Sequence, residues 1–156
     1  FRVDAEPFGI WYFKAAMTFP VDEYLRIDTD IVIRQDVSDV FSRQFDIAVA
    51  NKGKKAATNA GVMFVKNRDF FRESLDHYEK DTGMDNWQDL QKAMQLTING
   101  GNFNILQLAA DVYNYVPEEE CGMPIPDSAR IAHYKGKRKN RMMKDFGAVN
   151  YMGKAT

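Results

Sequence analysis

Two aspartates, Asp28 and Asp30, lie one residue apart within the otherwise apolar run of residues 24–33 (YLRIDTDIVI). Alternate residues of an extended strand share a face, so both carboxylates would point the same way. Two carboxylates this close repel each other, and one takes up a proton unless a cation lies between them. Oxygen ligands suit Mg²⁺, Mn²⁺ or Ca²⁺, so the pair is a candidate metal site. A strand end at which both acids reach water or cap a turn is the alternative, and it stays open because D-x-D is a common pattern.

A second candidate segment is the basic stretch of residues 133–139 (HYKGKRK), which closes an apolar strand. His133 offers one nitrogen ligand for a metal. Gly136 permits a tight turn, and Lys139 offers a positive point charge that suits phosphate. For each residue singly, the alternative is an ordinary histidine at a strand end followed by a solvated basic tail.

Two polar groups are candidates for binding a sugar. Asn59 opens a buried strand, where its amide could hydrogen-bond a sugar hydroxyl and Gly61 would give room; a turn before a strand explains both residues equally well. Gln88 and Asp89 follow Trp87 at the start of a helix. The helix dipole alone favours an aspartate there, and the functional interpretation is a carboxylate that faces a sugar pocket.

Hydrophobic spacing predicts the elements that must position these side chains. We expect a mostly buried helix over residues 8–19, helices over 68–80 and 87–96, and one helical turn after a turn at 36–41. Strands are expected over residues 23–27, 31–33, 45–50, 60–65, 103–108, 112–116 and 129–134, with loops at 51–58, 99–102 and 117–127. Alternating strands and helices predict an α/β fold with a mixed sheet flanked by helices.

The whole sequence predicts one domain over residues 1–156, with a basic tail at about 137–156. Lysine and arginine number 21 and aspartate and glutamate 22, so no bulk charge favours nucleic acid or an anionic membrane; the short basic run 135–144 leaves such phosphate contacts as a minor option. The single Cys121 excludes an internal disulfide and a cysteine-based zinc site, and it weakly favours a reducing compartment. No apolar run is long enough to span a bilayer, and Asp4 and Glu6 interrupt any signal-peptide pattern.

In order and spacing these motifs resemble family 8 glycosyltransferases, the group that includes glycogenin and bacterial lipopolysaccharide galactosyltransferases. The matching segments are L-R-I-D-T-D-I-V-I, D-V-S-D-V-F at residues 36–41, N-A-G-V-M at 59–63, W-Q-D-L at 87–90 and H-Y-K-G-K-R-K at 133–139. The resemblance runs from about Phe8 to Lys139 and implies the GT-A fold. It also implies transfer of a sugar from a nucleotide-diphosphate donor such as a UDP-sugar to an acceptor hydroxyl, with retention of configuration.

The resemblance implies a role for each candidate residue. Asp28, Asp30 and His133 would hold a Mn²⁺ or Mg²⁺ ion that bridges the donor diphosphate. The residues expected near the diphosphate are Lys139, Gly136 and Lys14, and those expected at the sugar are Asn59, Gly61, Gln88 and Asp89, the last two as the catalytic pair. The acceptor would be a glycan, a lipid-linked sugar or a protein.

The sequence also departs from the family pattern. Asn140 and Arg141 stand where the family has Pro-Trp, and the N-terminal strand–helix–strand unit that grips the nucleotide is not present, so we expect the C-terminal portion of a GT-A domain. A haloacid-dehalogenase-type phosphatase that uses Asp28 and Asp30, or a non-catalytic sugar-nucleotide-binding module, are the alternatives. A homo-oligomer stays open. We expect a cytoplasmic location, or the Golgi lumen if the full-length protein carries an anchor elsewhere.

Overall fold

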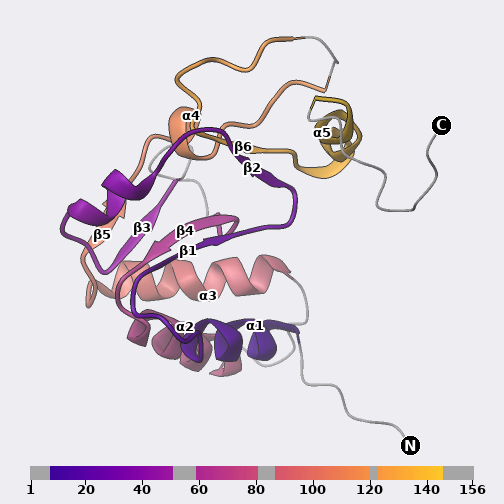
Figure 1. Cartoon of the computed structure of the whole chain (residues 1–156). Coiled ribbons are helices and arrows are strands. Elements are labelled where there is room, and N and C mark those ends of the chain that lie inside the picture. Colours follow the sequence, from indigo (N-terminus) through magenta and orange to yellow (C-terminus); the bar gives the residue numbers. More distant parts are fainter. Residues whose placement is uncertain (1–7, 51–58, 81–86, 120–122, 146–156) are drawn as a thin grey trace, which may run out of the picture.

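Four short strands form the main sheet of the protein. The computed structural model describes residues 8–50, 59–80, 87–119 and 123–145 (Figure 1). The strand order is β1-β4-β3-β5, with β1 and β3 antiparallel to β4 and β5 parallel to β3. The strands are β1 (Tyr24–Ile27), β3 (Ile47–Val49), β4 (Val62–Val65) and β5 (Ile105–Gln107). Both pairing directions occur, so the predicted mixed sheet of an α/β fold is confirmed.

Three helices cover one face of this sheet (Figure 1). They are α1 (Phe8–Met17), α2 (Asp69–Lys80) and α3 (Trp87–Gly100). The side chain of Asn67 accepts a hydrogen bond from the Asp69 backbone N–H at 3.0 Å, which satisfies a free donor in the first turn of α2. Only one side of α1 is buried, so the expectation of a mostly buried helix is wrong for Phe8 and Trp11, which are 53% and 60% exposed.

The main sheet carries an apolar core on each face. Because successive side chains of a strand point to opposite faces, β3 and β4 contribute to both cores. Toward the helices lie Ile47, Val49, Met63 and Val65. Toward the other face lie Ala48, Val62 and Phe64. This two-sided burial explains why β4 reads as an uninterrupted apolar run in the sequence.

A second, two-stranded sheet lies over the face opposite the three helices (Figure 1). It pairs β2 (Ile31–Ile33) with β6 (Ile131–His133) in antiparallel register, with Ile31 opposite His133. In chain order, β2 is followed by the short helix η1 (Ser38–Ser42), and β6 is followed by η2 (Gly136–Arg138) and α5 (Lys139–Asp145). β1 and β2 therefore belong to different sheets, although only three residues separate them.

Two segments differ from the expected elements. The strand predicted over residues 112–116 is wrong, because residues 110–113 form the short helix α4 (Ala110–Tyr113) and only Tyr115 makes a bridge, with Ala132. Helix α3 continues to Gly100 rather than ending at residue 96, and the turn follows at Gly101, whose φ is 76°.

Part of the expected basic tail has regular structure, because residues 136–145 form η2 and α5. The loop expected at residues 51–58, Cys121 and residues 146–156 lie outside the described residues. Within the described part of the chain, no helix is long and apolar enough to cross a membrane.

Candidate metal and phosphate site

Asp28 and Asp30 lie in the turn that connects the two sheets. They lie between β1 and β2, as the predicted strands over residues 23–27 and 31–33 imply. A turn separates the two strands, so a shared face of one extended strand is not what brings the carboxylates together. The Asp28 backbone N–H donates to the Gly61 carbonyl beside β4 at 3.0 Å. The Asp30 carbonyl accepts from the Tyr134 N–H beyond β6 at 2.8 Å. Each aspartate is thus fixed by its backbone to a different sheet.

His133, the last residue of β6, brings its imidazole to both carboxylates. Its Nε2 lies 3.1 Å from Asp30 Oδ1 and 3.7 Å from Asp28 Oδ2. One potential ligand atom from each of the three residues lies within 4.8 Å of the other two. The structure therefore brings together the three residues expected to bind a metal, although 102 residues separate Asp30 from His133 in the sequence.

Asn114 fixes the protonation of the His133 ring. Its side-chain Nδ2 donates to the Ala50 carbonyl at 3.0 Å, which turns its Oδ1 toward His133 Nδ1 at 2.9 Å. An amide oxygen only accepts, so Nδ1 must carry the proton. In the neutral ring, Nε2 then presents a lone pair to the two aspartates. Sequence reasoning missed Asn114, because it lies within the segment 112–116 expected to be a strand and matches no motif.

Electrostatics favour a cation at the point where these groups meet. Burial, and then the charge of Lys135, lower the pKa of His133, while Asp30 and Asp28 oppose that shift. Lowering the pKa favours the neutral ring, so a nitrogen lone pair and two carboxylates face one another. The His133 side chain is 3% exposed and that of Asp30 13%, so water screens them little. One nitrogen and carboxylate oxygens are a donor set that suits Mn²⁺ or Mg²⁺, so the residues present fit a divalent ion.

Lys139 stands at the mouth of the cluster. Its Nζ lies 3.3 Å from Asp30 Oδ2, while its side chain is 57% exposed. The chain reaches this point through η2, which begins at Gly136 with φ 61°, a left-handed conformation that glycine adopts without strain. Gly136 therefore permits the turn as expected, and Lys139 has a charged amine available to an anion at the surface.

The absence of a side chain at Gly61 makes room for His133 and Asp28, two of the candidate metal ligands. A Cβ at this position would lie 2.4 Å from His133 Cε1 and 2.8 Å from Asp28 Oδ2. The side chain of Asn59 accepts a hydrogen bond from the Gly61 N–H at 2.9 Å. Asn59 thus shapes the turn that lets Gly61 pass closely behind the metal site.

A pocket of about 170 Å³ opens beside Asp28. Its other lining residues are Phe8, Tyr12, Ala60, Trp87, Leu90 and Gln91. The predicted pair Gln88 and Asp89 lies in the first turn of α3, three and two residues before Gln91, and does not line this pocket. Lys14 lies on the exposed side of α1 and does not line it either.

Two arginines of the basic stretch turn inward. Arg138 donates to the Pro117 carbonyl at 2.6 Å, and Arg141 donates to the Glu118 carbonyl at 2.8 Å. Arg141 is buried and also pairs with Asp145 at 2.9 Å within α5. These side chains tie α5 to the loop that follows Pro117, and they are used for structure rather than presented to a solvent-borne anion.

Comparison with solved structures finds glycosyltransferases with the same fold. The crystal structure of the glycosyltransferase GlyE from Streptococcus pneumoniae TIGR4 matches with a TM-score of 0.63 and 16% identity over 92% of this chain and 43% of that one. Its apo form matches with a TM-score of 0.60 at 17% identity, over 82% of this chain and 37% of that chain. The sequence matches no protein-family profile, and a search of curated proteins found no similar sequence.

A third structure is a glycosyltransferase involved in glycosylation of the major capsid of PBCV-1. It matches with a TM-score of 0.57 and 17% identity over 85% of this chain and 72% of that chain. This chain therefore spans less than half of GlyE and most of the PBCV-1 enzyme. At such low identity the likeness concerns the fold, and the chain has the α/β fold of glycosyltransferases.

Proposed function

We propose that the protein is a metal-dependent glycosyltransferase of the family 8 type. It would move a sugar from a nucleotide-diphosphate donor to an acceptor hydroxyl with retention of configuration. The observation that carries the proposal is the meeting of Asp28, Asp30 and His133 at one point, with the Lys139 amine beside it. The glycosyltransferase fold of the chain supports it.

The proposed chemistry assigns a task to each group. Asp28, Asp30 and His133 would hold Mn²⁺ or Mg²⁺, which when bound supplies positive charge for the departing nucleotide diphosphate. Lys139 is close enough to the cluster to bind the same diphosphate, whose negative charge grows as the sugar–phosphate bond breaks. A charge interaction that strengthens in the transition state accelerates the reaction rather than merely binding the donor.

The pocket beside Asp28 is where we place the sugar. It adjoins one proposed metal ligand and is lined by an amide, that of Gln91, and by exposed Trp87. Sugars commonly meet proteins through such combinations of a polar group and an aromatic face. Gln88 and Asp89 stay proposed as the catalytic pair, acting from the first turn of α3 that also carries Trp87. Asn59 and Gly61 would border the site from the turn before β4.

The phosphatase alternative has less support. It would need a further acidic pair near Asp28 and Asp30 to hold a metal beside an aspartyl nucleophile. Within the described residues, the side chains next to these two aspartates are an imidazole and an ammonium group. A histidine and a lysine suit a metal-bound diphosphate, and they provide no second acidic pair.

The metal site can be tested by calorimetric titration with Mn²⁺. Wild-type protein should bind the ion, and Asp30→Asn should lose more than about 100-fold in affinity because it removes a charged ligand. Asp22→Asn is a matched control, since that exposed carboxylate pairs with Arg68 and is not one of the three proposed ligands. Equal Mn²⁺ affinity in the wild type and Asp30→Asn would refute the metal assignment.

The donor can be tested with a thermal-shift screen of nucleotide-sugars and UDP, with and without Mn²⁺. Stabilisation by the correct donor should require the metal and grow with ligand concentration. Lys139→Met should abolish this stabilisation and leave Mn²⁺ binding intact, whereas Lys144→Met should change neither. NMR of the product from the best donor would then report its anomeric configuration, and inversion would contradict the proposed retaining course.

A further inference from the structure

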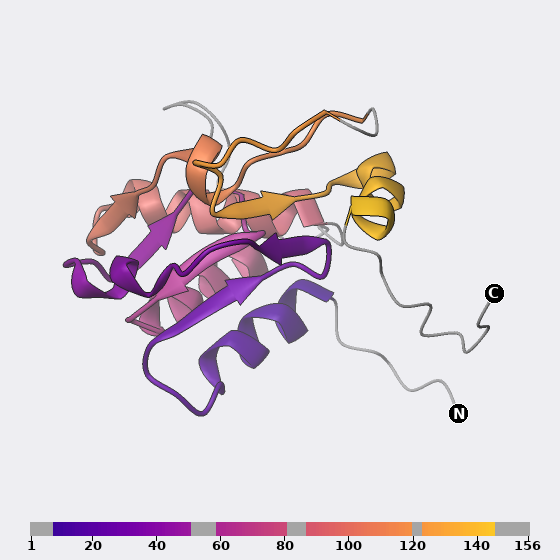
Figure 2. The same cartoon turned by 45° about the horizontal axis from the view of Figure 1, so that its top comes forward.

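The pocket of about 170 Å³ beside Asp28 lies where the first turns of α1 and α3 meet the turn after β1. Figure 2 shows the N-terminal end of α1 close to that turn, and Phe8 and Trp87, the first residues of the two helices, both line the pocket. Because the proposed metal ligand Asp28 forms part of the wall, a sugar held here would lie next to the phosphate groups that the metal binds.

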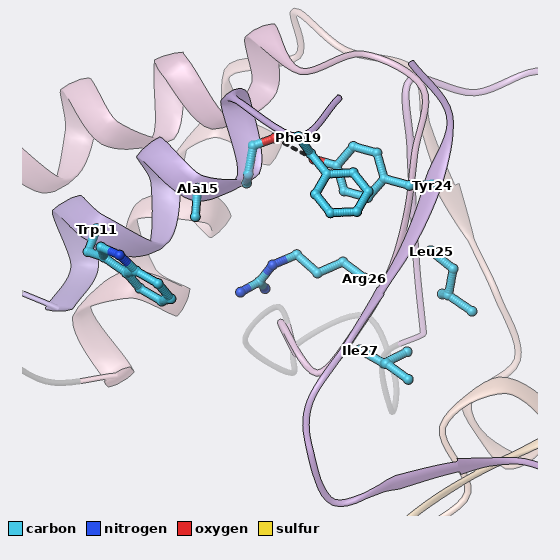
Figure 3. Close-up of a pocket in the computed structure, with 8 residues that line it drawn as sticks. Trp11, Ala15, Phe19, Tyr24, Leu25, Arg26 and Ile27 are labelled. Atoms are coloured by element: carbon cyan, nitrogen blue, oxygen red, sulfur yellow. Dashed lines mark hydrogen bonds between the residues drawn. The ribbon is translucent and has the colours of Figure 1, made fainter. Parts of the chain in front are cut away.

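A larger pocket, of about 350 Å³, lies between α1 and β1 (Figure 3). Trp11, Phe19 and Arg26 are among the side chains around it, and none of the three proposed metal ligands lines it. A sugar–phosphate bond placed there would lie away from the metal. Selection of the donor sugar therefore belongs to the smaller pocket.

The smaller pocket offers a sugar few polar side chains. In its described lining, an ionised Asp28 only accepts hydrogen bonds and the Trp87 indole only donates them. The Tyr12 hydroxyl does both, but it is buried and has no hydrogen-bond partner within the described structure. The half-buried Gln91 is thus the accessible side chain of this lining that can donate and accept at once.

The rest of the lining is apolar. Leu90 and Ala60 are buried, while Phe8 and Trp87 are exposed aromatic side chains. A plain hexose would turn hydroxyls toward these walls, and a hydroxyl buried without a partner is costly. A hexuronic acid would bring a carboxylate toward Asp28. An acetamido group instead offers an amide and a methyl, and the methyl gains from leaving water for an apolar wall.

Resting on the proposed function, we propose that the donor carries an N-acetylhexosamine and that Gln91 is the residue that selects it. The Gln91 amide would donate to the acetamido carbonyl and accept from the acetamido N–H. The acetyl methyl would pack against Leu90 and Trp87. A plain hexose has one hydroxyl in place of this group, so it would lose the paired amide contact and leave the apolar wall in contact with a polar group.

The test uses sugar 1-phosphates, whose binding does not depend on the nucleotide base. In the presence of Mn²⁺, NMR titration should show that N-acetylglucosamine 1-phosphate or N-acetylgalactosamine 1-phosphate binds at least about tenfold more tightly than the matching glucose or galactose compound, since a site built around an amide rejects an analogue that lacks one. Saturation transfer from the protein should be strongest to the acetyl methyl. Equal affinity within both pairs would overturn the proposal.

Gln91→Leu should remove the preference for the acetamido sugar. Gln95→Leu is the matched control, because Gln95 lies one turn further along α3, bonds to Asn99 at 3.0 Å and does not line the pocket. This control should keep the preference, and a preference that survives Gln91→Leu would overturn the role of Gln91.

Pyrophosphate with Mn²⁺ reports separately on the metal and phosphate site. If pyrophosphate does not bind, the proposed function fails, and the sugar assignment fails with it. If pyrophosphate binds and neither acetamido sugar is preferred, only the sugar assignment fails. Tighter binding of the 6-deoxy compound fucose 1-phosphate than of either acetamido sugar would also overturn it, since the apolar wall would then select a methyl group at C6.

Discussion

At the scale of single residues, Asn114 decides what His133 can offer. By accepting a hydrogen bond from Nδ1–H, it leaves the Nε2 lone pair directed at Asp28 and Asp30. Partners of this kind commonly orient metal-binding histidines and raise their basicity. The proposed metal site therefore extends beyond its three ligands to a residue that contacts no ion.

Asn114→Ala should weaken Mn²⁺ binding by about 10–100-fold, because the ring loses the group that fixes its tautomer. It should also cost about 1–3 kcal/mol of stability, since the Ala50 carbonyl and the ring nitrogen lose their partner. Calorimetry and urea denaturation measure the two effects. Asn104→Ala, at an exposed position away from the cluster, should leave Mn²⁺ affinity unchanged; similar losses in both variants would argue against a specific role for Asn114.

Gly61→Ala should damage the metal site by steric contact. The added Cβ would lie 2.4 Å from His133 Cε1, so the ring and Asp28 must shift. We expect loss of Mn²⁺ binding and about 1–3 kcal/mol of destabilisation, as for other overpacked sites. Gly101→Ala is the comparison: it strains a positive φ where nothing lies within 4 Å and should leave metal affinity as it was. Wild-type Mn²⁺ affinity in Gly61→Ala would contradict the tight packing.

At the scale of elements, one buried hydrogen bond links α2 to α3. Ser74 Oγ lies 2.9 Å from Thr97 Oγ1, which donates in turn to the Ala93 carbonyl. Both residues are fully buried. The pair positions the helix that carries Trp87 and Gln91 toward the pocket beside Asp28.

Thr97→Val should cost about 1–3 kcal/mol, because the Ser74 hydroxyl is left buried with its partner removed. Adding Ser74→Ala should recover part of that loss, since the stranded hydroxyl disappears. Urea denaturation of the two single variants and the double variant measures the coupling as a double-mutant cycle. Strictly additive effects would mean that the two hydroxyls do not depend on each other.

An ion pair also connects η1 to the strand segment before β6. Arg130 donates to Asp39 Oδ1 at 2.6 Å and to the Tyr113 hydroxyl at 2.8 Å. The hydrogen bond from Arg130 lowers the pKa of Asp39 below its ordinary value of 3.8. A lowered carboxyl pKa stabilises the fold above the ordinary value and loses this contribution as the pH falls through the folded value.

Asp39→Asn should therefore lower the melting temperature at pH 5 more than at pH 3, because pH 3 lies below the ordinary pKa of 3.8, so the unfolded wild-type chain is then largely protonated and the stabilisation shrinks. Thermal scans of both proteins at the two pH values measure the difference. The exposed position of the carboxylate keeps the effect small and sensitive to salt. An effect that grows toward low pH would contradict the direction of the pKa shift.

At the scale of the whole molecule, contacts remote from the cluster hold α5, the helix that begins with Lys139, in place. Arg141 joins α5 to the carbonyls of Glu118 and Met123, and the buried Tyr134 donates to Asp145 at 3.1 Å. Burial raises the pKa of Tyr134 to about 12, so its hydroxyl stays a donor at neutral pH. The position of the lysine thus depends on contacts on the far side of its own helix.

Arg141→Leu should weaken binding of UDP in the presence of Mn²⁺ and leave affinity for Mn²⁺ alone unchanged, because α5 loses its anchor while the three ligands keep theirs. Calorimetry with the metal and then with the nucleotide separates the two steps. Lys144 is exposed on the same helix, so Lys144→Gln serves as the control. This variant should bind both Mn²⁺ and UDP normally. Loss of Mn²⁺ affinity in Arg141→Leu would show that α5 supports the metal ligands as well.

Much of this arrangement follows from the sequence, for identifiable reasons. The strands at β3 and β4 are short apolar runs that are buried on both faces, a pattern that composition reveals directly. The joint presence of Asp28, Asp30 and His133 was predicted through the order of motifs. The reason given for the approach of the two aspartates was wrong, because a turn between two sheets joins them and not the pleat of one strand.

Other features depend on tertiary contacts that local patterns do not encode. Residues 112–116 have the apolar pattern expected of a strand, but residues 110–113 form α4 instead. There the Tyr113 ring is buried in the core on the sheet face opposite the three helices, and its hydroxyl accepts a hydrogen bond from Arg130. Asn114 then points at His133 from the end of that helix. Its role is visible only once α4 and β6 are placed side by side.

The turn at residues 28–30 is also the shortest covalent link between the two sheets. Its backbone is bonded to β4 at one end and to the segment after β6 at the other. An ion held by both aspartates and His133 would therefore restrict the motion of one sheet relative to the other. Amide hydrogen exchange in β2 and β6 should then be slower with Mn²⁺ than without it, even when no substrate is present. The rigidity of the connection between the two sheets would depend on the metal.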